Sequence, residues 1–317
     1  MRLAVIDMGT NTFHLLIVDL EGDGFTVIYK EKIAVKIGKG GISTGRITEE
    51  ASFRAIKALK RFREIIDEHQ VDDIYATATS AIRNAINGKS LVALIERETG
   101  INTRIISGLE EATFIYDGVK RALDIGSTPV LIMDIGGGSI EFIIGTNEKI
   151  LWKRSFEVGG QRLIDRFHKH DPINAFEEEA LKDYLEGELS ELKEVAAVFD
   201  IKTLIGSSGT FDTLSDIYRN RIGQVKDSKA TEFPLGFEEF KLIVADLITK
   251  TRNQRLEVPG MIPLRADMIV VAVILVKYVT DLFNIEDIRV SAYALKEGVL
   301  LSTIDNVKSD SINSQEN

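Results

Sequence analysis

Two stretches of this sequence follow the same order: an apolar strand, an aspartate, a glycine-containing turn and a second apolar strand. They begin at Ile6 and at Met133, and they align without gaps at an offset of 127 residues, which is 134 minus 7. The aligned pairs are Asp7 with Asp134, Gly9 with Gly136 and Thr12 with Ser139. Because this offset is about one domain length, the repeat predicts two similar lobes that face each other.

Chain length and composition agree with two lobes. The 317 residues exceed the usual size of a single hydrophobic core. Turn-forming residues concentrate at 124–129, so we place the boundary there and expect domains over residues 1–124 and 125–305. The polar composition after residue 305 predicts a disordered tail over residues 306–317. The absence of cysteine excludes disulfides and thiolate metal sites.

Charge and hydropathy exclude several classes of partner. The net charge of −10 argues against general nucleic-acid binding, because affinity for phosphate backbones comes from clustered Lys and Arg. The longest apolar run, residues 268–276, is far shorter than the roughly 20 residues that span a bilayer, so we expect a buried helix there and no membrane association. Asp7 comes too early for a signal peptide, and we expect a cytoplasmic protein.

The spacing of apolar residues predicts an α/β fold. Alternating or continuous apolar runs predict strands, and apolar residues at helical spacing predict helices between them. The expected strands cover residues 3–8, 12–20, 25–37, 73–78, 103–107, 130–133, 203–205 and 288–290. The expected helices cover residues 51–66, 91–99, 109–123, 161–168, 176–198, 237–250, 266–283 and 294–301.

The second repeat has the residues of a magnesium and phosphate site. Asp134 closes an apolar strand, where an ionised carboxylate is costly unless donors or a metal satisfy it. Glu141 lies just beyond the same turn, so the hairpin brings both acids to its mouth. Two carboxylates beside substrate phosphate suit Mg²⁺, which prefers oxygen ligands. The alternative is an ordinary glycine-rich hairpin with solvated acids.

Glycine turns expose backbone N–H groups, and such groups bind phosphate oxygens without any lysine. A third turn of this kind, at residues 206–210, precedes a predicted helix and adds hydroxyl groups. The expected phosphate-binding residues are Gly9, Thr10, Asn11, Thr12, Gly136, Gly137, Gly138, Ser139, Gly206, Ser207, Ser208, Gly209 and Thr210.

Four stretches together resemble one known family. They cover residues 5–14, 105–112, 133–141 and 206–210. In this order they are similar to the exopolyphosphatase/guanosine pentaphosphate phosphohydrolase family, from about residue 2 to residue 305. That family belongs to the actin-like phosphotransferase superfamily, so the resemblance implies two tandem ribonuclease-H-like domains around a cleft. Residues 293–298 also resemble the family, although Lys296 stands where the family commonly has arginine.

The resemblance implies roles for individual residues. Glu111 corresponds to the catalytic base or water-positioning acid, and Arg83 to an arginine that grips the phosphate chain. Asp134 and Glu141 correspond to the magnesium acids, and Asp7 is a further candidate ligand. The plainer interpretations stay open: Glu111 could be a first-turn acid favoured by the helix dipole, and Arg83 a surface residue.

Three other features have a plain and a functional interpretation. His14, in an apolar strand, is expected to be a packed core histidine rather than a metal ligand. The His-Asp pair at His170-Asp171 is shared with HD phosphohydrolases, but alone it is weak evidence. The lysines of residues 30–39 form either a solvated basic face or a track for a polyanion.

The leading hypothesis is a Mg²⁺-dependent phosphohydrolase that releases terminal orthophosphate from linear polyphosphate, from guanosine pentaphosphate, or from both. The alternative is an actin-like nucleotide-binding sensor or assembly protein without useful turnover. A small-molecule kinase is disfavoured, since no insert to close over a hydroxyl substrate is evident. The choice of substrate and the oligomeric state stay open, with a homodimer as one alternative.

Overall fold

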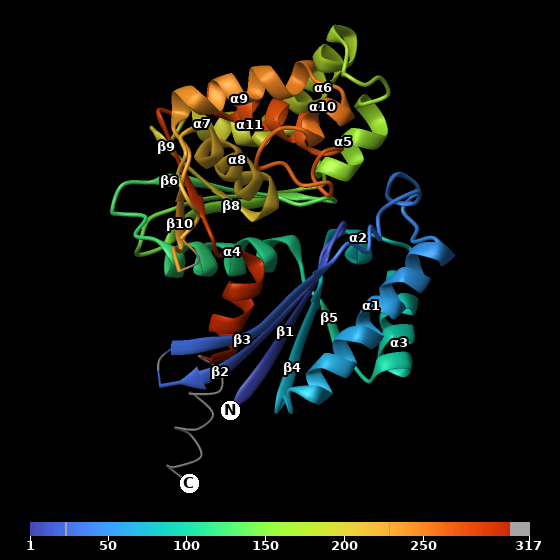
Figure 1. Ribbon diagram of the computed structural model, residues 1–317. Coiled ribbons are helices and arrows are strands. Elements are labelled where there is room, and N and C mark those ends of the chain that lie inside the picture. The colour runs from blue at the N-terminus through green and yellow to red at the C-terminus, as the bar shows by residue number, and fades with distance from the viewer. Residues whose placement is uncertain (23, 228, 305–317) are drawn as a thin grey trace. The chain divides into compact units, whose positions relative to one another are not determined.

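The computed structural model describes residues 1–22, 24–227 and 229–304, and within them the chain forms two compact units (Figure 1). Unit 1 contains Met1–Gly118 and the chain from Leu295, and unit 2 contains Val119–Ala294. The division falls inside helix α4 (Gly108–Ala122) rather than at the expected boundary between residues 124 and 125. Residues 295–304, expected in the second domain, group with unit 1. The expected tail, residues 306–317, lies outside the described residues.

The sheet of unit 1 has five strands in the order β3-β2-β1-β4-β5. The strands are β1 (Arg2–Met8), β2 (Phe13–Glu21), β3 (Gly24–Ile33), β4 (Asp73–Ala78) and β5 (Thr103–Ile105). β1, β2 and β3 form an antiparallel meander, whereas β4 and β5 run parallel to β1. Parallel neighbours need crossover connections, and the helices of unit 1 supply them.

Helices α1 and α3 bury one face of this sheet. The helical elements of unit 1 are η1 (Ile42–Thr44), α1 (Glu49–Glu68), α2 (Ser80–Arg83), α3 (Gly88–Thr99) and the first part of α4. Thr48 caps α1 by accepting a hydrogen bond from the Ala51 amide. Alternate residues of β1 and β2 pack with the apolar faces of α1 and α3 into one core.

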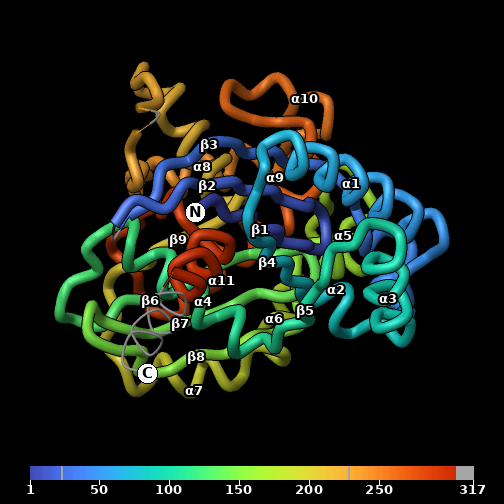
Figure 2. The backbone as a smooth tube through the Cα atoms, turned by 90° about the horizontal axis from the view of Figure 1, so that it is seen from below, coloured from blue at the N-terminus to red at the C-terminus, as the bar shows by residue number. Residues whose placement is uncertain are grey.

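A helix over residues 295–304 packs on α4. A Cβ atom at Gly298 would fall 1.7 Å from the Phe114 carbonyl oxygen, so the two helix backbones approach as closely as a glycine allows. The two views of the chain agree with this contact (Figures 1 and 2). The contact explains why the end of the described chain groups with unit 1.

The sheet of unit 2 has six strands in the order β10-β11-β9-β6-β7-β8. The strands are β6 (Val130–Ile135), β7 (Ile140–Gly145), β8 (Ile150–Phe156), β9 (Thr203–Ser207), β10 (Glu232–Pro234) and β11 (Asp287–Ser291). β6, β7 and β8 form an antiparallel meander, and β9 and β11 run parallel to β6 and to each other. β10 adds an antiparallel strand at the edge.

The helices of unit 2 stack on one face of its sheet (Figure 1). They are α5 (Gly160–Phe167), α6 (Ala175–Glu188), α7 (Ser190–Ala196), α8 (Ser208–Arg221), α9 (Phe237–Thr249), α10 (Arg252–Leu256) and α11 (Ile269–Phe283). α11 carries the long apolar run and is buried at the centre of the core, as predicted. Within the described residues, no helix has the length and hydropathy needed to cross a membrane.

The two sheets share one topology. Without β10, unit 2 reads β8-β7-β6-β9-β11, which matches β3-β2-β1-β4-β5 strand for strand and direction for direction. This is the ribonuclease-H-like order, so the predicted α/β fold with two tandem domains of this kind is confirmed. The main correction within the helices is at Leu189, where the single helix expected over residues 176–198 is divided into α6 and α7.

Candidate active site

The two predicted phosphate turns have the same backbone geometry. In the first, the Gly9 amide donates to the Thr12 carbonyl oxygen at 3.1 Å, and in the second the Gly136 amide donates to the Ser139 carbonyl oxygen at 3.1 Å. A Cβ atom would fall 3.0 Å from that oxygen at Gly9 and 2.9 Å from it at Gly136. Glycine is therefore required at both positions by close approach of the backbone.

The second turn is fixed from its carbonyl side. The carbonyl oxygens of residues 136–138 accept hydrogen bonds from the amides of residues 159–161, at 2.8 to 3.2 Å. The Arg162 Nε also donates to the Gly138 carbonyl oxygen, at 2.8 Å. The Gly137 and Gly138 amides donate to no group within the described part of the chain. Two N–H groups in a fixed turn are what an anion-binding nest needs.

Asp134 and Glu141 lie side by side across β6 and β7. They are partners in the strand register, and both are buried, at 6% and 1% exposed. Asp134 Oδ2 accepts hydrogen bonds from Ser207 Oγ at 2.8 Å and Ser208 Oγ at 2.6 Å. Glu141 Oε1 accepts one from Ser155 Oγ at 2.7 Å. These hydroxyl groups hold both carboxylates in place and partly offset the cost of burying them.

The pair of carboxylates fits a magnesium ion. Among the described residues, no group of three His, Asp or Glu side chains is arranged to hold a metal. Mg²⁺ does not need such a cage, because it commonly binds one or two carboxylates and completes its shell with water and substrate phosphate. Asp134 and Glu141 supply oxygen donors of this kind beside a turn suited to phosphate.

The third turn holds Asp134 through its hydroxyl groups. Ser207 ends β9, and Ser208 begins α8 with φ at +67°, a left-handed conformation that is costly for a residue with a side chain. This bend aims both hydroxyls at Asp134. Thr210 Oγ1, by contrast, is buried without a hydrogen-bond partner in the described structure. The sequence predicted phosphate contacts here, and the structure adds this second role.

Arg265 is a site residue to which the sequence analysis gave no role. Its guanidinium occupies the space beside Gly209, where a Cβ atom would fall 1.8 Å from a terminal nitrogen. Burial lowers the pKa of Arg265, whereas the charges of Asp212 and Asp134 oppose the shift. Because Gly209 has no side chain, the Arg265 guanidinium comes close enough to Asp134 for their charges to interact. The sequence shows only a glycine after two serines, and this pattern does not indicate that Arg265 packs against it.

In unit 1, Glu111 and Arg83 form a buried ion pair. Arg83 Nη1 lies 2.8 Å from Glu111 Oε2 and also donates to the Ile106 carbonyl oxygen at 3.2 Å. The side chains are 15% and 8% exposed, so Arg83 is not the surface residue of the plainer interpretation. Arg83 ends the short helix α2 and Glu111 lies in the first turn of α4. The structure brings together the two residues for which the resemblance implied catalysis.

The neighbouring acid, Glu110, forms hydrogen bonds with Ser107 instead. It accepts a hydrogen bond from the Ser107 amide at 2.9 Å, while its own amide donates to Ser107 Oγ at 3.2 Å. This reciprocal pair caps α4. The Ser107 backbone hydrogen bond is the main cause that lowers the pKa of Glu110. Both acids lie in the first turn of α4, but Glu110 caps the helix, whereas Glu111 pairs with Arg83.

Asp7 and His14 occupy in unit 1 the positions of Asp134 and Glu141. They are register partners across β1 and β2, and both are half-buried. His14 Nε2 lies 3.0 Å from Thr12 Oγ1, a hydroxyl of the first turn. His14 was expected to be a packed core histidine, but it is only half-buried, on the sheet face opposite the α1–α3 core.

The His-Asp pair before α6 makes packing contacts. Asp171 Oδ1 lies 3.0 Å from the buried Arg255 guanidinium, and His170 Nδ1 lies 2.8 Å from Glu177 Oε1. Glu177 in turn completes the capping box of α6 with Asn174. These contacts join the loop to the helices around it and explain the two residues without any hydrolase chemistry.

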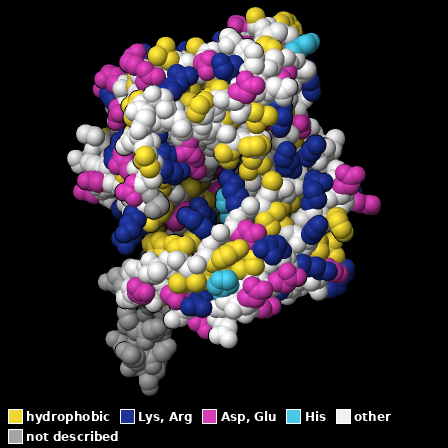
Figure 3. Space-filling model, viewed as in Figure 1, with side chains coloured by type: hydrophobic (Ala, Val, Ile, Leu, Met, Phe, Trp, Pro, Cys, Tyr) yellow, Lys and Arg dark blue, Asp and Glu magenta, His cyan; other side chains and the backbone are white. Residues whose placement is uncertain are grey.

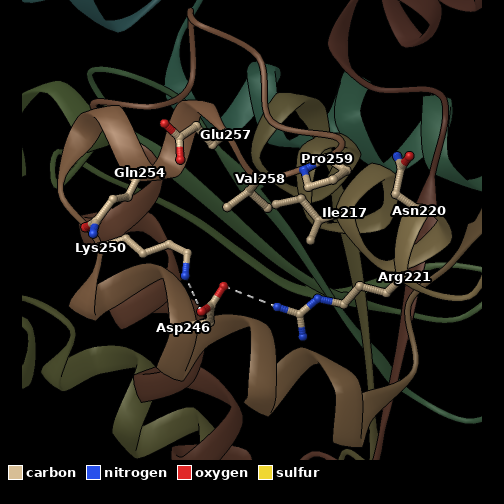
Figure 4. A pocket seen from close by; sticks show the side chains of 9 residues that line it. All are labelled: Ile217, Asn220, Arg221, Asp246, Lys250, Gln254, Glu257, Val258 and Pro259. Atoms are coloured by element: carbon tan, nitrogen blue, oxygen red, sulfur yellow. Dashed lines mark hydrogen bonds and ion pairs between the residues drawn. The ribbon is translucent and has the colours of Figure 1, made fainter.

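A pocket between α8, α9 and α10 lies among residues that no prediction included (Figure 4). Its side chains are Ile217, Asn220, Arg221, Asp246, Lys250, Gln254, Glu257, Val258 and Pro259. Asp246 bonds to Lys250 Nζ at 2.6 Å and to Arg221 Nη2 at 3.3 Å. Because its central carboxylate is paired with both cations, this pocket offers no evident anion site.

The profile of the Ppx/GppA phosphatase family matches residues 16–307. The chain belongs to this family. The predicted resemblance is therefore confirmed, and the four stretches that carried it lie at the two hairpin turns and at the starts of α4 and α8.

Among solved structures of Ppx/GppA proteins, an exopolyphosphatase from Cytophaga hutchinsonii superposes with a TM-score of 0.93 and 46% identity, over 96% of this chain and 98% of that one. The Aquifex aeolicus family member gives a TM-score of 0.79 and 27% identity, over 96% and 98%.

Curated Ppx/GppA relatives differ in length. Exopolyphosphatase 1 of Mycobacterium leprae is 27% identical over 310 residues, which cover 96% of this chain and 90% of that protein. The bifunctional 3-dehydroquinate synthase/phosphatase of Fusobacterium nucleatum is 31% identical over 324 residues, and the chain spans about half of its length (46%).

Proposed function

We propose that this chain is a Mg²⁺-dependent phosphohydrolase that releases terminal orthophosphate from linear inorganic polyphosphate, guanosine pentaphosphate, or both. The observation that carries the proposal is the pair of buried carboxylates, Asp134 and Glu141, beside a turn whose Gly137 and Gly138 amides donate to no group among the described residues. Membership of the Ppx/GppA phosphatase family and the names of its curated exopolyphosphatase relatives support the reaction class.

Asp134 and Glu141 are the proposed magnesium ligands, with Asp7 as a further acid. Bound Mg²⁺ would neutralise phosphate oxygens as charge develops on them. The serine hydroxyls on Asp134 and Glu141 keep the carboxylate oxygens oriented, and such supporting contacts matter for metal affinity. Within each unit, the amides of the glycine turn are fixed dipoles that suit phosphate oxygens, where negative charge is concentrated.

Glu111 is the proposed acid that orients the attacking water or accepts its proton. Phosphoryl transfer depends on positioning and charge neutralisation more than on covalent help. The Arg83 guanidinium holds the Glu111 carboxylate at 2.8 Å and is itself a strong ligand for phosphate oxygens. The pair thus places a proton acceptor and a phosphate clamp next to each other.

The decisive experiment measures orthophosphate release by Glu111→Gln. We expect kcat to fall by about 10²- to 10⁴-fold, because the amide cannot accept a proton. Long polyphosphate, short polyphosphate and guanosine pentaphosphate would be compared at equal concentrations of ends, with and without a magnesium chelator. Glu110→Gln is the matched control, since that acid is next in sequence but caps α4 and pairs with Arg104.

Release that persists in Glu111→Gln at the wild-type rate would contradict the role of Glu111. Absence of release from all three substrates with Mg²⁺ present would contradict the phosphohydrolase itself. Tight ATP binding by calorimetry together with no release would favour the nucleotide-binding sensor instead.

A further inference from the structure

The first glycine turn is next to the most basic stretch of the chain. Between residues 25 and 46 there are five cations, and the single acid is Glu31. The cations are Lys30, Lys32, Lys36, Lys39 and Arg46. Both signs of charge are interspersed over the visible face of the molecule, so the net charge of −10 does not mean a uniformly acidic surface (Figure 3). A local basic site is compatible with the total.

Strand register places Lys32 in one row with the first hairpin. Lys32 is the partner of His14 across β3 and β2, His14 is the partner of Asp7, and Asp7 is the partner of Thr77 across β1 and β4. Paired residues of neighbouring strands share a sheet face. We call these four residues the first row. Lys32 is exposed, whereas His14 and Asp7 are half-buried.

The loop after β3 is fixed against the first turn. The Lys36 amide donates to the Asn11 carbonyl oxygen at 2.9 Å, and the Gly38 amide donates to the Thr10 carbonyl oxygen at 3.3 Å. A Cβ atom at Gly38 would fall 2.6 Å from Thr10 Cγ2, so loop and turn are in close contact. The basic stretch is therefore anchored beside the turn at two places, through the row at Lys32 and through this loop.

The equivalent row of unit 2 has no cation and one more carboxylate. It contains Ser155, Glu141, Asp134 and Ser207 in the same strand order. Serine stands where unit 1 has Lys32, and glutamate stands where unit 1 has His14. We call these residues the second row. Two carboxylates favour a cation there, whereas the first row has one carboxylate, Asp7, and adds the Lys32 ammonium at its exposed end, where an anion is favoured.

We propose that Lys32, with His14 beside it, binds a non-terminal phosphoryl group of a condensed phosphate chain next to the first glycine turn. The inference rests on the proposed function and adds to it a residue that determines preference for chains over single phosphates. A lysine suits this task because its ammonium is a compact charge on a flexible stem, which binds phosphate oxygens without demanding one geometry.

Lys32→Met tests the subsite, because it removes the charge and keeps most of the stem. Binding of inorganic tripolyphosphate and of orthophosphate would be measured by calorimetry in the Glu111→Gln background. We expect the tripolyphosphate Kd to rise roughly 10- to 100-fold, which is the loss of hydrogen bonds to a charged group, and the orthophosphate Kd to change less. In the otherwise wild-type chain, KM for polyphosphate should rise while kcat changes little.

Lys30→Met is the matched control. Lys30 lies on the same strand and the same sheet face, but its register partner is Leu16, so it is outside the first row. It should leave both Kd values unchanged. Equal weakening by the two variants would overturn the inference, because it would indicate a diffuse effect of charge. A fall in kcat with unchanged KM for Lys32→Met would overturn it as well.

The binding measurement is independent of turnover. If the wild-type chain released no phosphate, the proposed function would fail, yet the difference between Lys32→Met and Lys30→Met in tripolyphosphate binding would still decide the subsite. Circular dichroism and thermal unfolding of each variant establish that the fold is intact before binding is compared.

Discussion

The hairpins β1–β2 and β6–β7 share a turn geometry and a sheet position but differ in the side chains behind the turn. In unit 2 both acids of the site lie on the hairpin itself, where serine hydroxyls hold them. In unit 1 the hairpin carries one acid, Asp7, next to His14, and the second acid of the unit, Glu111, comes from α4 instead. A repeated backbone has therefore been given two kinds of chemistry.

This difference teaches that the repeat specifies where a ligand can lie but not what the ligand is. The turns offer amides in both units because close backbone contacts at Gly9 and Gly136 set their shape. The rows behind them decide the sign of charge that each unit accepts. A mixed row beside one turn and an acidic row beside the other suit an anionic chain and its divalent counterion.

Among substitutions that make the two rows more alike, we expect the largest effect at Glu141. Glu141→Gln keeps the shape of the second row but removes one of its two charges, so we expect the Mg²⁺ concentration for half-maximal rate to rise and kcat to fall by about 1,000-fold, since the charge stabilisation supplied by a metal is worth several kcal/mol. Titration of phosphate release with Mg²⁺ measures both quantities.

His14→Gln is the counterpart of that variant in the first row. Because His14 is not a proposed metal ligand, this change should leave the half-saturating Mg²⁺ concentration at the wild-type value, even where substrate binding weakens. Equal shifts of the Mg²⁺ requirement in Glu141→Gln and His14→Gln would contradict the division of roles between the rows.

The sequence was sufficient to predict the hairpins because their information is local. The offset of 127 residues, the position of each aspartate and the glycines fix strand, turn and register together. The pairing of Asp134 with Glu141 follows from that register. The break at Leu189 was missed although Gly187 lies two residues before it, because apolar spacing continues through residues 176–198 and a single glycine inside a helical pattern does not by itself end a helix.

Contacts between residues distant in sequence could not be predicted from local sequence patterns. Arg265 reaches the site only because Gly209, distant in sequence, has no side chain in its way. The pairing of Arg83 with Glu111 depends on how α2 and α4 pack, and only the family resemblance suggested that both residues act together. The final helix was likewise expected, over residues 294–301, but its apolar residues do not indicate which of the two cores it packs against.

The next prediction concerns the backbone geometry that the two glycine turns share. Gly9→Ala and Gly136→Ala should each destabilise the chain by about 1 to 3 kcal/mol, because the added methyl group overpacks a carbonyl oxygen in both turns. Urea unfolding measures the loss. A cost at one position without a similar cost at the other would show that the two turns are less alike than their hydrogen bonds indicate.

The smallest expected effect separates the two neighbouring acids of α4. The pKa of Glu110 is lowered, mainly by the hydrogen bond from the Ser107 amide, so its contribution to stability is full above the ordinary glutamate pKa of about 4.3. That contribution is lost as the pH falls through the lower pKa of the folded state. Because the Glu110 side chain is partly exposed and its pair with Arg104 is screened by solvent, we expect a loss of only a few tenths of a kcal/mol in Glu110→Gln at neutral pH. The difference from wild type in urea unfolding should shrink between about pH 5 and pH 3. A difference that is the same at every pH would mean that shape rather than charge makes the cap, and a loss of phosphate release would move Glu110 from the cap into the site with Glu111.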